Sequence, residues 1–460
     1  MMLLSEAAGY MSGELLSDDD AWVASVGSDS RNITKGELFF AIKGENFDGH
    51  AYAAQAIQQG ASAVVISDKN CAVRPAILVK DSLLALGDLA KSWRNQLTLP
   101  LVAVTGSNGK TTVKDMLAAI LNAALANKAA GRAVLATQGN LNNHIGMPMT
   151  LLKLRKEHAF AVIEMGMNHL REIAYLSKIA QPNVAVINNA GTAHIGELGS
   201  RENIAKAKGE IFDGLAADGV AVINADDAFA DYWKSLNKNK KIITFSLDNK
   251  ADVTASYAEV DGVSQIMLTT PTGNIGFKLN MLGKHNISNA LAASACAVAL
   301  GIANADIAQA LSNFGAVKGR LQRKAGINGA NLLDDTYNAN PDSMKAAIDV
   351  LAAQTGGTVF VMGDMAELGA ESAAMHAEIG AYAKQKGIHQ LLGLGDMCKH
   401  AVAAFGAHGE HFDALEANIH AAHRASKKDV TILVKGSRFM QMERVVAAIE
   451  EKLGVKLGDK

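Results

Sequence analysis

The chain has 460 residues, with 44 basic and 46 acidic side chains and a formal net charge of −2. Nearly half of it is hydrophobic (49%) and only 6 residues are proline, which excludes collagen-like, proline-rich and disordered chains and favours compact α/β layers. The balanced charge argues against a protein that binds nucleic acid through a large basic face. At ~150 residues per domain, the length predicts about three domains.

The cysteines Cys71, Cys296 and Cys398 are scattered and form no CxxC pair. This pattern predicts neither a disulfide framework nor a zinc site and fits a reducing cytoplasm. The longest nearly apolar run, residues 290–303, is shorter than the ~20 residues that a membrane span needs. We therefore expect a soluble, cytoplasmic protein without a membrane span.

Residues 1–97 hold short β-like runs (LFFAI, AVVIS and AILVK) separated by loops with glycine and aspartate. A helix is predicted over residues 81–96, at the end of this stretch. We expect a smaller N-terminal α/β domain here.

Residues 98–318 alternate between apolar runs and amphipathic segments. The runs LVAVTG, FAVIEMG, VAVINNAG and GVAVINADD are each followed by a polar turn and a helix-like segment. This alternation predicts a doubly wound, mostly parallel sheet covered by helices. The stretch closes with an alanine-rich helix predicted over residues 289–301.

The alternation starts again in residues 319–460. The predicted strands are NLLDDT, TVFVMGD, LLGLGD and TILVKGS, and the predicted helices between them include residues 343–354 and 372–386. We expect a Rossmann-like C-terminal α/β domain, which makes three domains in all.

The strongest motif is LVAVTGSNGKTT (101–112), in which an apolar strand runs into a glycine-rich turn and a helix. Glycines let backbone N–H groups surround a phosphate, and the helix N-terminus adds a positive dipole end. Lys110 suits the β- and γ-phosphates and the Thr111 hydroxyl suits Mg²⁺. Val104 stands where the usual motif has glycine, so this is a variant loop. A guanine-reading Asn-Lys-x-Asp is missing, which argues against a GTPase.

Two further side chains follow neighbouring strands. Glu164 ends FAVIE, and His194 lies in the turn NNAGTAH. In an open α/β sheet, ligands gather at the carboxyl ends of the strands. A threonine hydroxyl, a carboxylate and an imidazole at this edge could hold Mg²⁺ against a triphosphate.

Lys208 interrupts an apolar stripe in RENIAKAKGEIFDGL, which we interpret as one helix. Ile204, Ile211 and Leu215 form the stripe, and Lys208 falls inside it. One interpretation is a lysine that extends out of the stripe into water. The other is a buried, neutral amine that takes up CO₂ to form a carbamate, an anion able to ligate Mg²⁺.

The motifs TGSNGKTT, EMG, NNAGTAH, AKGEIF and GKHNISNALAA, in this order, resemble the Mur ligase family, the ATP-dependent amide-forming enzymes of bacterial peptidoglycan synthesis. DDTYNANPDSM (334–344) and TQGNLNNHIGMP (137–148) resemble the branch that adds D-alanyl-D-alanine. The Asp-Asn-Pro-Arg stretch of the branch that adds meso-diaminopimelate is missing, and its nearest match is ANPD at 339–342. The segment SDSRNITKGELFFAIKGENFDGH is similar to the family's uridine-diphosphate-binding domain.

This resemblance implies a role for each matching residue. ATP phosphates would be bound by Gly106, Ser107, Asn108, Gly109, Lys110, Thr111 and Thr112. Mg²⁺ would be held by Thr111, Glu164, His194 and a carbamylated Lys208. Catalytic roles are implied for Lys110, His194, Lys208 and Arg320, of which Arg320 would reach the phosphates from the C-terminal domain. Asn286 and Asn289 would lie near adenine and Asp335 at the nucleotide ribose. Substrate contacts are implied for Ser30 and Arg31 (uridine diphosphate) and for Asn140, Asn143, Tyr337, Asn338 and Asn340 (peptide and dipeptide).

The implied reaction joins D-alanyl-D-alanine to the peptide carboxylate of UDP-N-acetylmuramoyl-tripeptide, through an acyl phosphate, with release of ADP and phosphate. Residues 1–97 would bind the UDP-sugar, 98–318 ATP, and 319–460 would close on ATP and bind D-alanyl-D-alanine. Two alternatives remain open: another Mur-type or folyl-polyglutamate ligase, or a nucleotide-binding regulator without ligase chemistry. We expect a monomer with small-molecule substrates and no nucleic acid partner.

Overall fold

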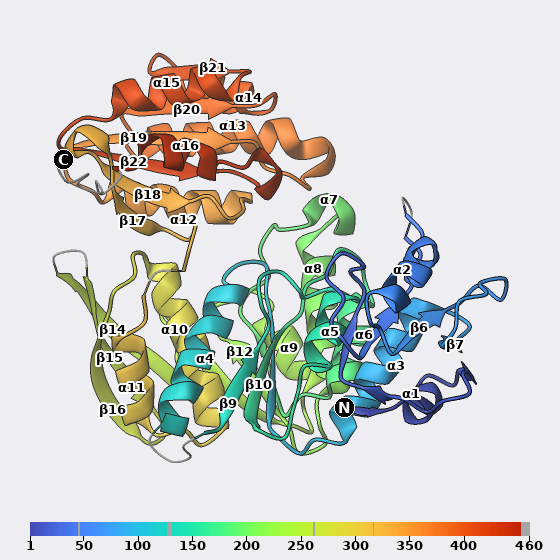
Figure 1. Cartoon of the computed structure of the whole chain (residues 1–460). Coiled ribbons are helices and arrows are strands. Elements are labelled where there is room, and N and C mark those ends of the chain that lie inside the picture. Colours follow the sequence, from blue (N-terminus) through green and yellow to red (C-terminus); the bar gives the residue numbers. More distant parts are fainter. Residues whose placement is uncertain (45–46, 127–130, 261–262, 316, 452–460) are drawn as a thin grey trace, which may run out of the picture.

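The computed structural model describes residues 1–451 except 45–46, 127–130, 261–262 and 316. Residues 452–460, which belong to the predicted third domain, lie outside the described residues. The described chain forms sheets of five, nine and six strands and a small two-stranded sheet. Figure 1 shows the six-stranded sheet in orange and red above the central sheet, with the N-terminal elements in blue beside it.

The N-terminal region contains a mixed five-stranded sheet in the order β2-β7-β6-β5-β4, in which only β2 is antiparallel to its neighbour. Helix α2 covers one face of this sheet, and α1 and α3 cover the other. The elements are β1 (Met2–Leu3), α1 (Leu4–Tyr10), β2 (Glu14–Leu16), β3 (Trp22–Val23), β4 (Ser25–Gly27), β5 (Glu37–Phe40), α2 (Ala53–Gln58), β6 (Ala63–Ile66), β7 (Ala76–Leu78) and α3 (Ser82–Asn95).

Helix α3 joins the N-terminal region to the central one. Asp81 caps its N-terminus by accepting hydrogen bonds from the N–H groups of Leu83 and Leu84. Near its other end, the Trp93 indole donates to the Leu154 carbonyl, and the buried Arg94 guanidinium donates to the Ala180 carbonyl. One hydrophobic core runs from the N-terminal sheet through α3 into the central sheet. The first two regions are therefore packed as one body.

The central sheet has the order β16-β15-β14-β13-β12-β11-β8-β10-β9, with parallel pairing from β9 to β14. Its strands are β8 (Leu101–Thr105), β9 (Ala133–Ala136), β10 (His158–Glu164), β11 (Val184–Ile187), β12 (Val220–Asn224), β13 (Lys241–Ser246), β14 (Val253–Val260), β15 (Val263–Thr270) and β16 (Gly273–Leu279). Its helices are α4 (Lys110–Ala126), α5 (Gly146–Leu151), α6 (Glu172–Ala180), α7 (Ile195–Leu198), α8 (Arg201–Gly209), α9 (Ala230–Leu236), α10 (Lys284–Ala299) and α11 (Asn304–Ser312).

Side chains alternate between the two faces of the parallel strands. The β8 valines Val102 and Val104 pack under α4, α10 and α11, whereas Leu101 and Ala103 face the core that α5, α6 and α8 cover. Helices thus cover both faces, and the predicted doubly wound sheet is confirmed. Strand β8 lies between β10 and β11, so the chain reverses its strand order there. Such a switch point is where open α/β sheets bind ligands.

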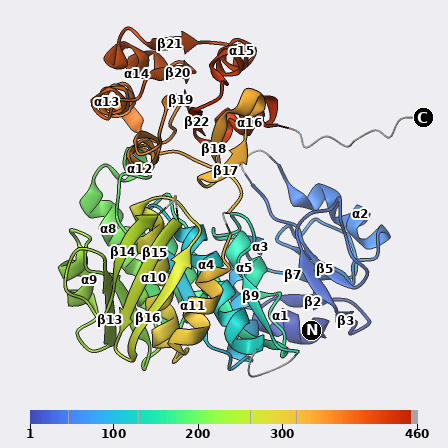
Figure 2. The same cartoon turned by 90° about the vertical axis from the view of Figure 1, so that its left-hand side faces the viewer.

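Two predictions for the central region are wrong. Residues 241–279 do not alternate between strands and helices: β13, β14, β15 and β16 follow one another, and the last three pair as antiparallel hairpins (Figure 2). RENIAKAKGEIFDGL is not one α-helix, because α8 ends at Gly209 and a 3-10 turn, η2 (Glu210–Gly214), continues it. The tighter turn directs the chain back under α6, where the Ser177 hydroxyl donates to the Ile211 carbonyl.

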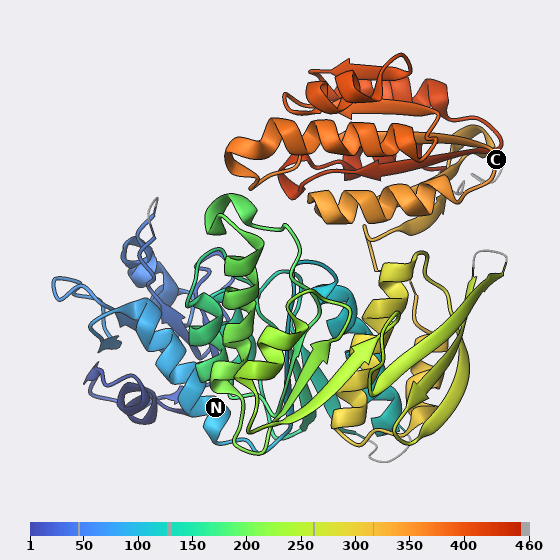
Figure 3. The same cartoon turned by 180° about the vertical axis from the view of Figure 1, so that it is seen from behind.

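The C-terminal sheet has the order β17-β18-β22-β19-β20-β21 and is parallel except for β17. Figure 3 shows it from behind, with α12 on the side that faces the central sheet. Helices α12, α13 and α14 cover one face, and α15 and α16 cover the other. The elements are β17 (Gln322–Ala325), β18 (Asn331–Asp335), α12 (Pro341–Ala352), β19 (Gly357–Gly363), α13 (Ser372–Gln385), β20 (Gln390–Leu394), α14 (Cys398–Phe405), β21 (Gly409–Phe412), α15 (Leu415–Ala425), β22 (Val430–Lys435) and α16 (Glu443–Ile449).

The Rossmann-like architecture expected for this region is confirmed. Within the described residues, no helix has the length and apolar character needed to cross a membrane.

Candidate active site

The glycine-rich loop between β8 and α4 is shaped as an anion cradle. Lys110 folds back so that its Nζ donates to the Gly106 carbonyl at 2.8 Å. Gly109 has a φ of 78°, and a Cβ there would collide with the amides of Asn188 and Asn289. Only glycine fits that position without strain. Burial lowers the pKa of Lys110, and the charge of Glu164 opposes this effect.

A cluster of asparagine side chains holds the glycine-rich loop in place through hydrogen bonds. The Asn108 N–H donates to the Asn189 side chain at 2.8 Å, and the Asn108 carbonyl accepts the Asn188 amide at 2.9 Å. Asn188 also donates to the Asn289 side chain at 2.8 Å, and Asn289 donates to Asn286 at 3.1 Å. The two residues predicted to lie near adenine are therefore buried and help to hold the phosphate loop.

Glu164 lies at the end of β10, beside the start of α4. Its Oε2 accepts the Thr111 hydroxyl at 2.9 Å, and its Oε1 accepts the Asn142 amide at 2.7 Å. The carboxylate is almost fully buried, at 2% exposure. Because β8 and β10 are adjacent and parallel, the sheet brings Thr111 and Glu164 together as the sequence predicted.

His194 follows β11, on the other side of β8. It precedes α7 with a left-handed φ of 65°. Its Nδ1 lies 2.7 Å from Oε2 of Glu367, a residue of the C-terminal region, although without the in-line approach of a full hydrogen bond. The loop that carries His194 is tied to the phosphate loop, because the Gly191 N–H donates to the Ser107 hydroxyl.

Lys208 is only 2% exposed, so the interpretation as a lysine that reaches water is wrong. Among the described residues, its ammonium has neither a hydrogen bond nor an ion pair. Burial lowers the pKa of Lys208 well below its usual range, the charge of Lys110 lowers it further, and Asp227 opposes both. These surroundings shift the amine toward its neutral form, which is the form that carbamate formation requires.

The C-terminal region reaches the phosphate loop at several points. The Arg320 guanidinium donates to the Thr111 hydroxyl at 2.9 Å and stacks 4.2 Å above the Tyr337 ring. Asn340 caps α12 through Ser343 and also donates to the Asn108 side chain at 2.7 Å. The structure is therefore closed over the loop.

Two carboxylates of the C-terminal region, Asp342 and Asp335, are held by hydrogen bonds or an ion pair to other residues of the protein. Asp342 accepts hydrogen bonds from the N–H and the hydroxyl of Thr192 at 2.7 and 2.8 Å. Asp335, the predicted ribose contact, lies 2.6 Å from the Lys435 ammonium, and its other oxygen accepts the Leu321 N–H. Asp342 thus holds the His194 loop, and Lys435 fixes the orientation of Asp335.

One cavity of about 1150 Å³ lies between the central and C-terminal regions. It does not include four of the predicted residues: Gly106, Lys208, Ser30 and Arg31. Arg31 is exposed and paired with Asp29 at 2.8 Å in the N-terminal region. The predicted residues that line the cavity are Ser107, Asn108, Gly109, Lys110, Thr111, Thr112, Asn140, Asn143, Glu164, His194, Asn286, Asn289, Arg320, Asp335, Tyr337, Asn338 and Asn340.

Sequence reasoning missed many residues that line this cavity, among them Asn142, Asp342, Glu367 and Lys435. Asn142 lies between the predicted Asn140 and Asn143, and it is the one that binds Glu164, whereas the Asn143 side chain caps the start of α5. The run NLNNH offered no signal to choose among its asparagines.

The donor set suits a hard divalent cation. Thr111 and Glu164 offer oxygen, which Mg²⁺ prefers, and Thr111 directly follows Lys110, the lysine predicted to bind phosphate. His194 approaches from the adjacent strand end, with one nitrogen facing Glu367. The chemical types of these donors therefore fit the expected Mg²⁺, although Arg320 now donates to the Thr111 hydroxyl that would bind it.

Known families match three successive parts of the chain. Residues 23–94 match the Mur ligase family catalytic domain, 104–297 the Mur ligase middle domain, and 319–438 the Mur ligase glutamate ligase domain. A curated relative from Escherichia coli (strain K12), UDP-N-acetylmuramoyl-tripeptide–D-alanyl-D-alanine ligase, is 44% identical, and the alignment covers 97% of this chain and 98% of the relative. The chain belongs to the Mur ligase family.

Other relatives in the family extend the similarity. The ligase of the same name from Bacillus subtilis (strain 168) is 36% identical, with 93% of each chain covered. The crystal structure of MurF from Acinetobacter baumannii superposes with a TM-score of 0.90 at 36% identity, covering 97% of this chain and 98% of that one. MurF from Thermotoga maritima in complex with ADP gives a TM-score of 0.83 at 28% identity, covering 93% and 97%.

Proposed function

We propose that this protein is the ATP-dependent ligase that joins D-alanyl-D-alanine to UDP-N-acetylmuramoyl-tripeptide. Nearly full-length similarity to ligases of that name supports the substrates. One geometric observation supports the chemistry: Arg320 of the C-terminal region and Glu164 of the central sheet meet on the same Thr111 hydroxyl. A phosphate-binding loop covered from both sides suits transfer of a phosphoryl group away from water.

The reaction needs two steps, because a carboxylate is a poor electrophile. In the first, an oxygen of the tripeptide carboxylate attacks the γ-phosphorus of ATP, giving an acyl phosphate and ADP. In the second, the free amine of D-alanyl-D-alanine attacks the acyl carbon, the carbon–oxygen bond to phosphate breaks, and the nitrogen loses a proton. Lys110 and Arg320 lie where they would offset charge on the transferring group.

We also propose a Mg²⁺ site and a modified lysine here. Thr111, Glu164 and His194 would hold the metal, which would supply positive charge against the triphosphate. In its neutral form, which desolvation and Lys110 favour, the Lys208 amine would add to CO₂ and release a proton, leaving a carbamate.

The three regions divide the work in this proposal. Residues 1–97 bind the UDP-sugar, 98–318 bind ATP, and 319–460 close on ATP and bind the dipeptide. We further expect a cytoplasmic monomer that does not bind nucleic acid. Light scattering on a size-exclusion column tests the oligomeric state.

The test of the function is ADP release with each substrate omitted in turn. The proposed ligase releases ADP rapidly only when UDP-N-acetylmuramoyl-tripeptide, D-alanyl-D-alanine and ATP are all present. A folyl-polyglutamate type of ligase would instead respond to glutamate. A regulator would hydrolyse ATP slowly, at a rate that muramoyl peptides do not change. Either result would overturn the assignment.

A further inference from the structure

Glu367 belongs to a loop of the C-terminal region, 364–369, that presses against α7 of the central region. The Gly196 N–H donates to the Glu367 carbonyl at 3.0 Å. A Cβ on Gly196 would lie 2.6 Å from the Gly369 nitrogen, so the two backbones are as close as glycine allows. In the same contact, Oε2 of Glu367 lies 2.7 Å from Nδ1 of His194.

Both partners have unusual backbones. The φ angle is 65° at His194 and 63° at Glu367, a left-handed conformation that side chains other than glycine rarely adopt. Such conformations persist only where the surrounding structure enforces them, and they concentrate at functional sites. Here two of them face each other across a boundary between regions.

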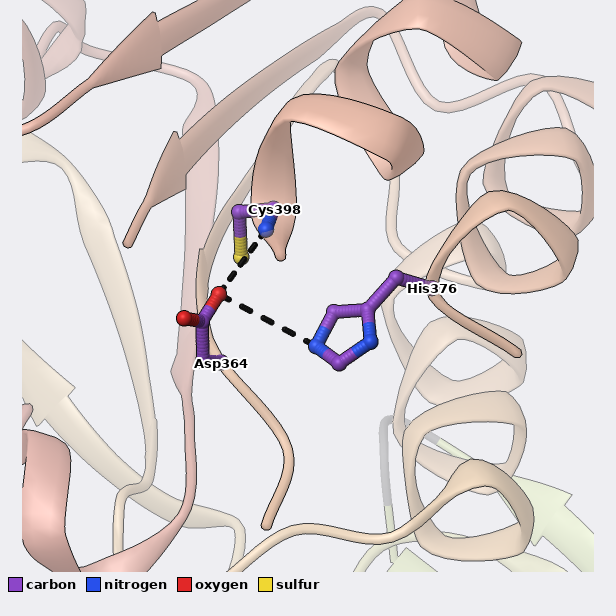
Figure 4. Close-up of side chains that lie close together, drawn as sticks. All are labelled: Asp364, His376 and Cys398. Carbon is purple, nitrogen blue, oxygen red and sulfur yellow. Dashed lines mark hydrogen bonds and ion pairs between the residues drawn. The ribbon is translucent and has the colours of Figure 1, made fainter. Parts of the chain in front are cut away.

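A buried cluster holds the loop that carries Glu367. Figure 4 shows Asp364, His376 and Cys398 gathered at the end of β19. The Asp364 carboxylate accepts the Cys398 N–H at 2.8 Å, and Nε2 of His376 accepts the Met365 N–H at 2.9 Å. The Ala366 N–H donates to the Ser437 hydroxyl at 2.8 Å. Three successive loop positions are thus fixed before the chain reaches Glu367.

The composition of this cluster also suits a metal ion, but its hydrogen bonds argue against one. Nδ1 of His376 lies 2.7 Å from the Ser372 carbonyl, and Nε2 accepts the Met365 N–H, so neither ring nitrogen has a free lone pair. Burial lowers the pKa of His376, which keeps the ring neutral as these bonds require. The cluster is a support for the loop.

We propose that Glu367 is a positioning residue for His194. Glu367 orients this proposed metal ligand only when the C-terminal region is docked on the central region. The inference rests on the proposed metal role of His194. With its Oε2 2.7 Å from Nδ1, the Glu367 carboxylate would favour the tautomer that carries the proton on Nδ1, which would leave the Nε2 lone pair for the metal. Histidines that bind metals usually donate their other N–H to a carboxylate or carbonyl. The metal site is therefore complete only when the C-terminal region has closed on the central region.

The test uses Mn²⁺ in place of Mg²⁺, with the non-hydrolysable analogue AMPPCP bound to the full chain. Electron paramagnetic resonance gives the Mn²⁺ affinity, and the electron spin echo modulation reports nitrogen bound to the metal. Glu367→Ala should weaken Mn²⁺ binding ~10- to 100-fold and reduce the nitrogen modulation. Glu367→Gln keeps an oxygen acceptor and should lose less. Glu371→Ala, an exposed acid four positions along the chain, is the matched control.

A double variant separates positioning from direct binding. If Glu367 acts through His194, then His194→Ala and His194→Ala/Glu367→Ala bind Mn²⁺ equally. If Glu367→Ala keeps the wild-type Mn²⁺ affinity and nitrogen modulation, the proposal is overturned. It is also overturned if the loss of Mn²⁺ affinity in Glu367→Ala adds fully to the loss in His194→Ala. A wild-type protein without nitrogen modulation would contradict it too. None of these measurements needs turnover, so a failed ligase assay leaves the inference intact.

Discussion

Lys208 shows how much one side chain can indicate when its surroundings are known. The apolar stripe around it left two interpretations open, and its burial decides between them, because a lysine at 2% exposure is not extended into water. The pattern in the sequence could place Lys208 on the buried side of the chain. It could not show that Lys110 and Asp227 are its electrostatic neighbours, since these lie on other elements.

Replacing Lys208 by alanine tests the carbamate. We expect kcat to fall about 10²- to 10³-fold, because the site loses an anion that offsets metal charge. Acetate or formate should restore part of the activity by occupying the space, as measured by ADP release. Lys206→Ala, an exposed lysine on the same helix, should stay near wild type. Full activity of Lys208→Ala without added carboxylate would rule out an essential carbamate.

Arg320 makes a second prediction at the scale of one residue. Its guanidinium bonds to the Thr111 hydroxyl from the opposite side of the cavity, so Arg320→Ala should reduce kcat about 10²-fold or more. Binding of AMPPCP, measured by calorimetry, should change much less, because Lys110 and the loop backbone remain. Arg323→Ala, an exposed neighbour on β17, is the control. An equal loss of kcat and binding would contradict a role in closure.

Elements were predictable where their pattern was regular. The parallel strands end in glycine or in polar turns, and their valine-rich runs show the buried faces clearly. Strands β14 to β16 were missed because their exposed face carries polar and apolar residues without strict alternation, as in the run Tyr257–Val260. β14 joins the sheet beside β13, and antiparallel pairing then adds β15 and β16, which no βαβ pattern signals.

Helix α13 carries a prediction for pH dependence. Burial lowers the pKa of His376 below its usual 6.5, against the opposing charge of Asp364 and together with that of His400. The unfolded chain therefore binds a proton more readily than the folded one, and the free energy of unfolding falls as the pH drops through about 6.5. The slope from this group is at most about 1.4 kcal/mol per pH unit.

Urea unfolding followed by circular dichroism, between about pH 8 and about pH 5, measures this effect. His376→Gln should be less stable than wild type at the higher pH but should lose less stability on acidification. His423→Gln, an exposed histidine on α15, should keep the wild-type pH dependence. Parallel curves for wild type and His376→Gln would show that His376 does not titrate between the two states.

The whole molecule consists of two packing units. Among the residues that the structure describes, the N-terminal and central regions share one hydrophobic core, whereas the C-terminal region has two cores of its own, to which only Leu282 and Ile195 are added from outside it. Contacts between the units are mainly polar. This is also why the candidate site was only partly predictable: pairs such as Asp342 with Thr192 join residues 150 positions apart through a docking geometry that local patterns do not encode.

Unfolding should reveal the two units. All three tryptophans, Trp22, Trp93 and Trp233, lie in the first unit, so their fluorescence does not report on the C-terminal region. Without nucleotide, the urea curves from tryptophan fluorescence and from far-UV circular dichroism should not coincide. The variant Phe412→Trp, on β21, should show the missing transition by fluorescence. Coincident curves from both probes would mean that the chain unfolds as one cooperative unit.

The narrow contact at Gly196 has a practical consequence for anyone who wants to study the molecule in an open form. Because there is no room for even one methyl group between Gly196 and Gly369, Gly196→Ala places a spacer in the joint. The backbone at Gly196 does not need a positive φ, so the helix can accept alanine without local distortion. The added methyl group would keep the C-terminal region from closing fully on the central region, without a crosslink. It would leave every cavity-lining side chain unaltered.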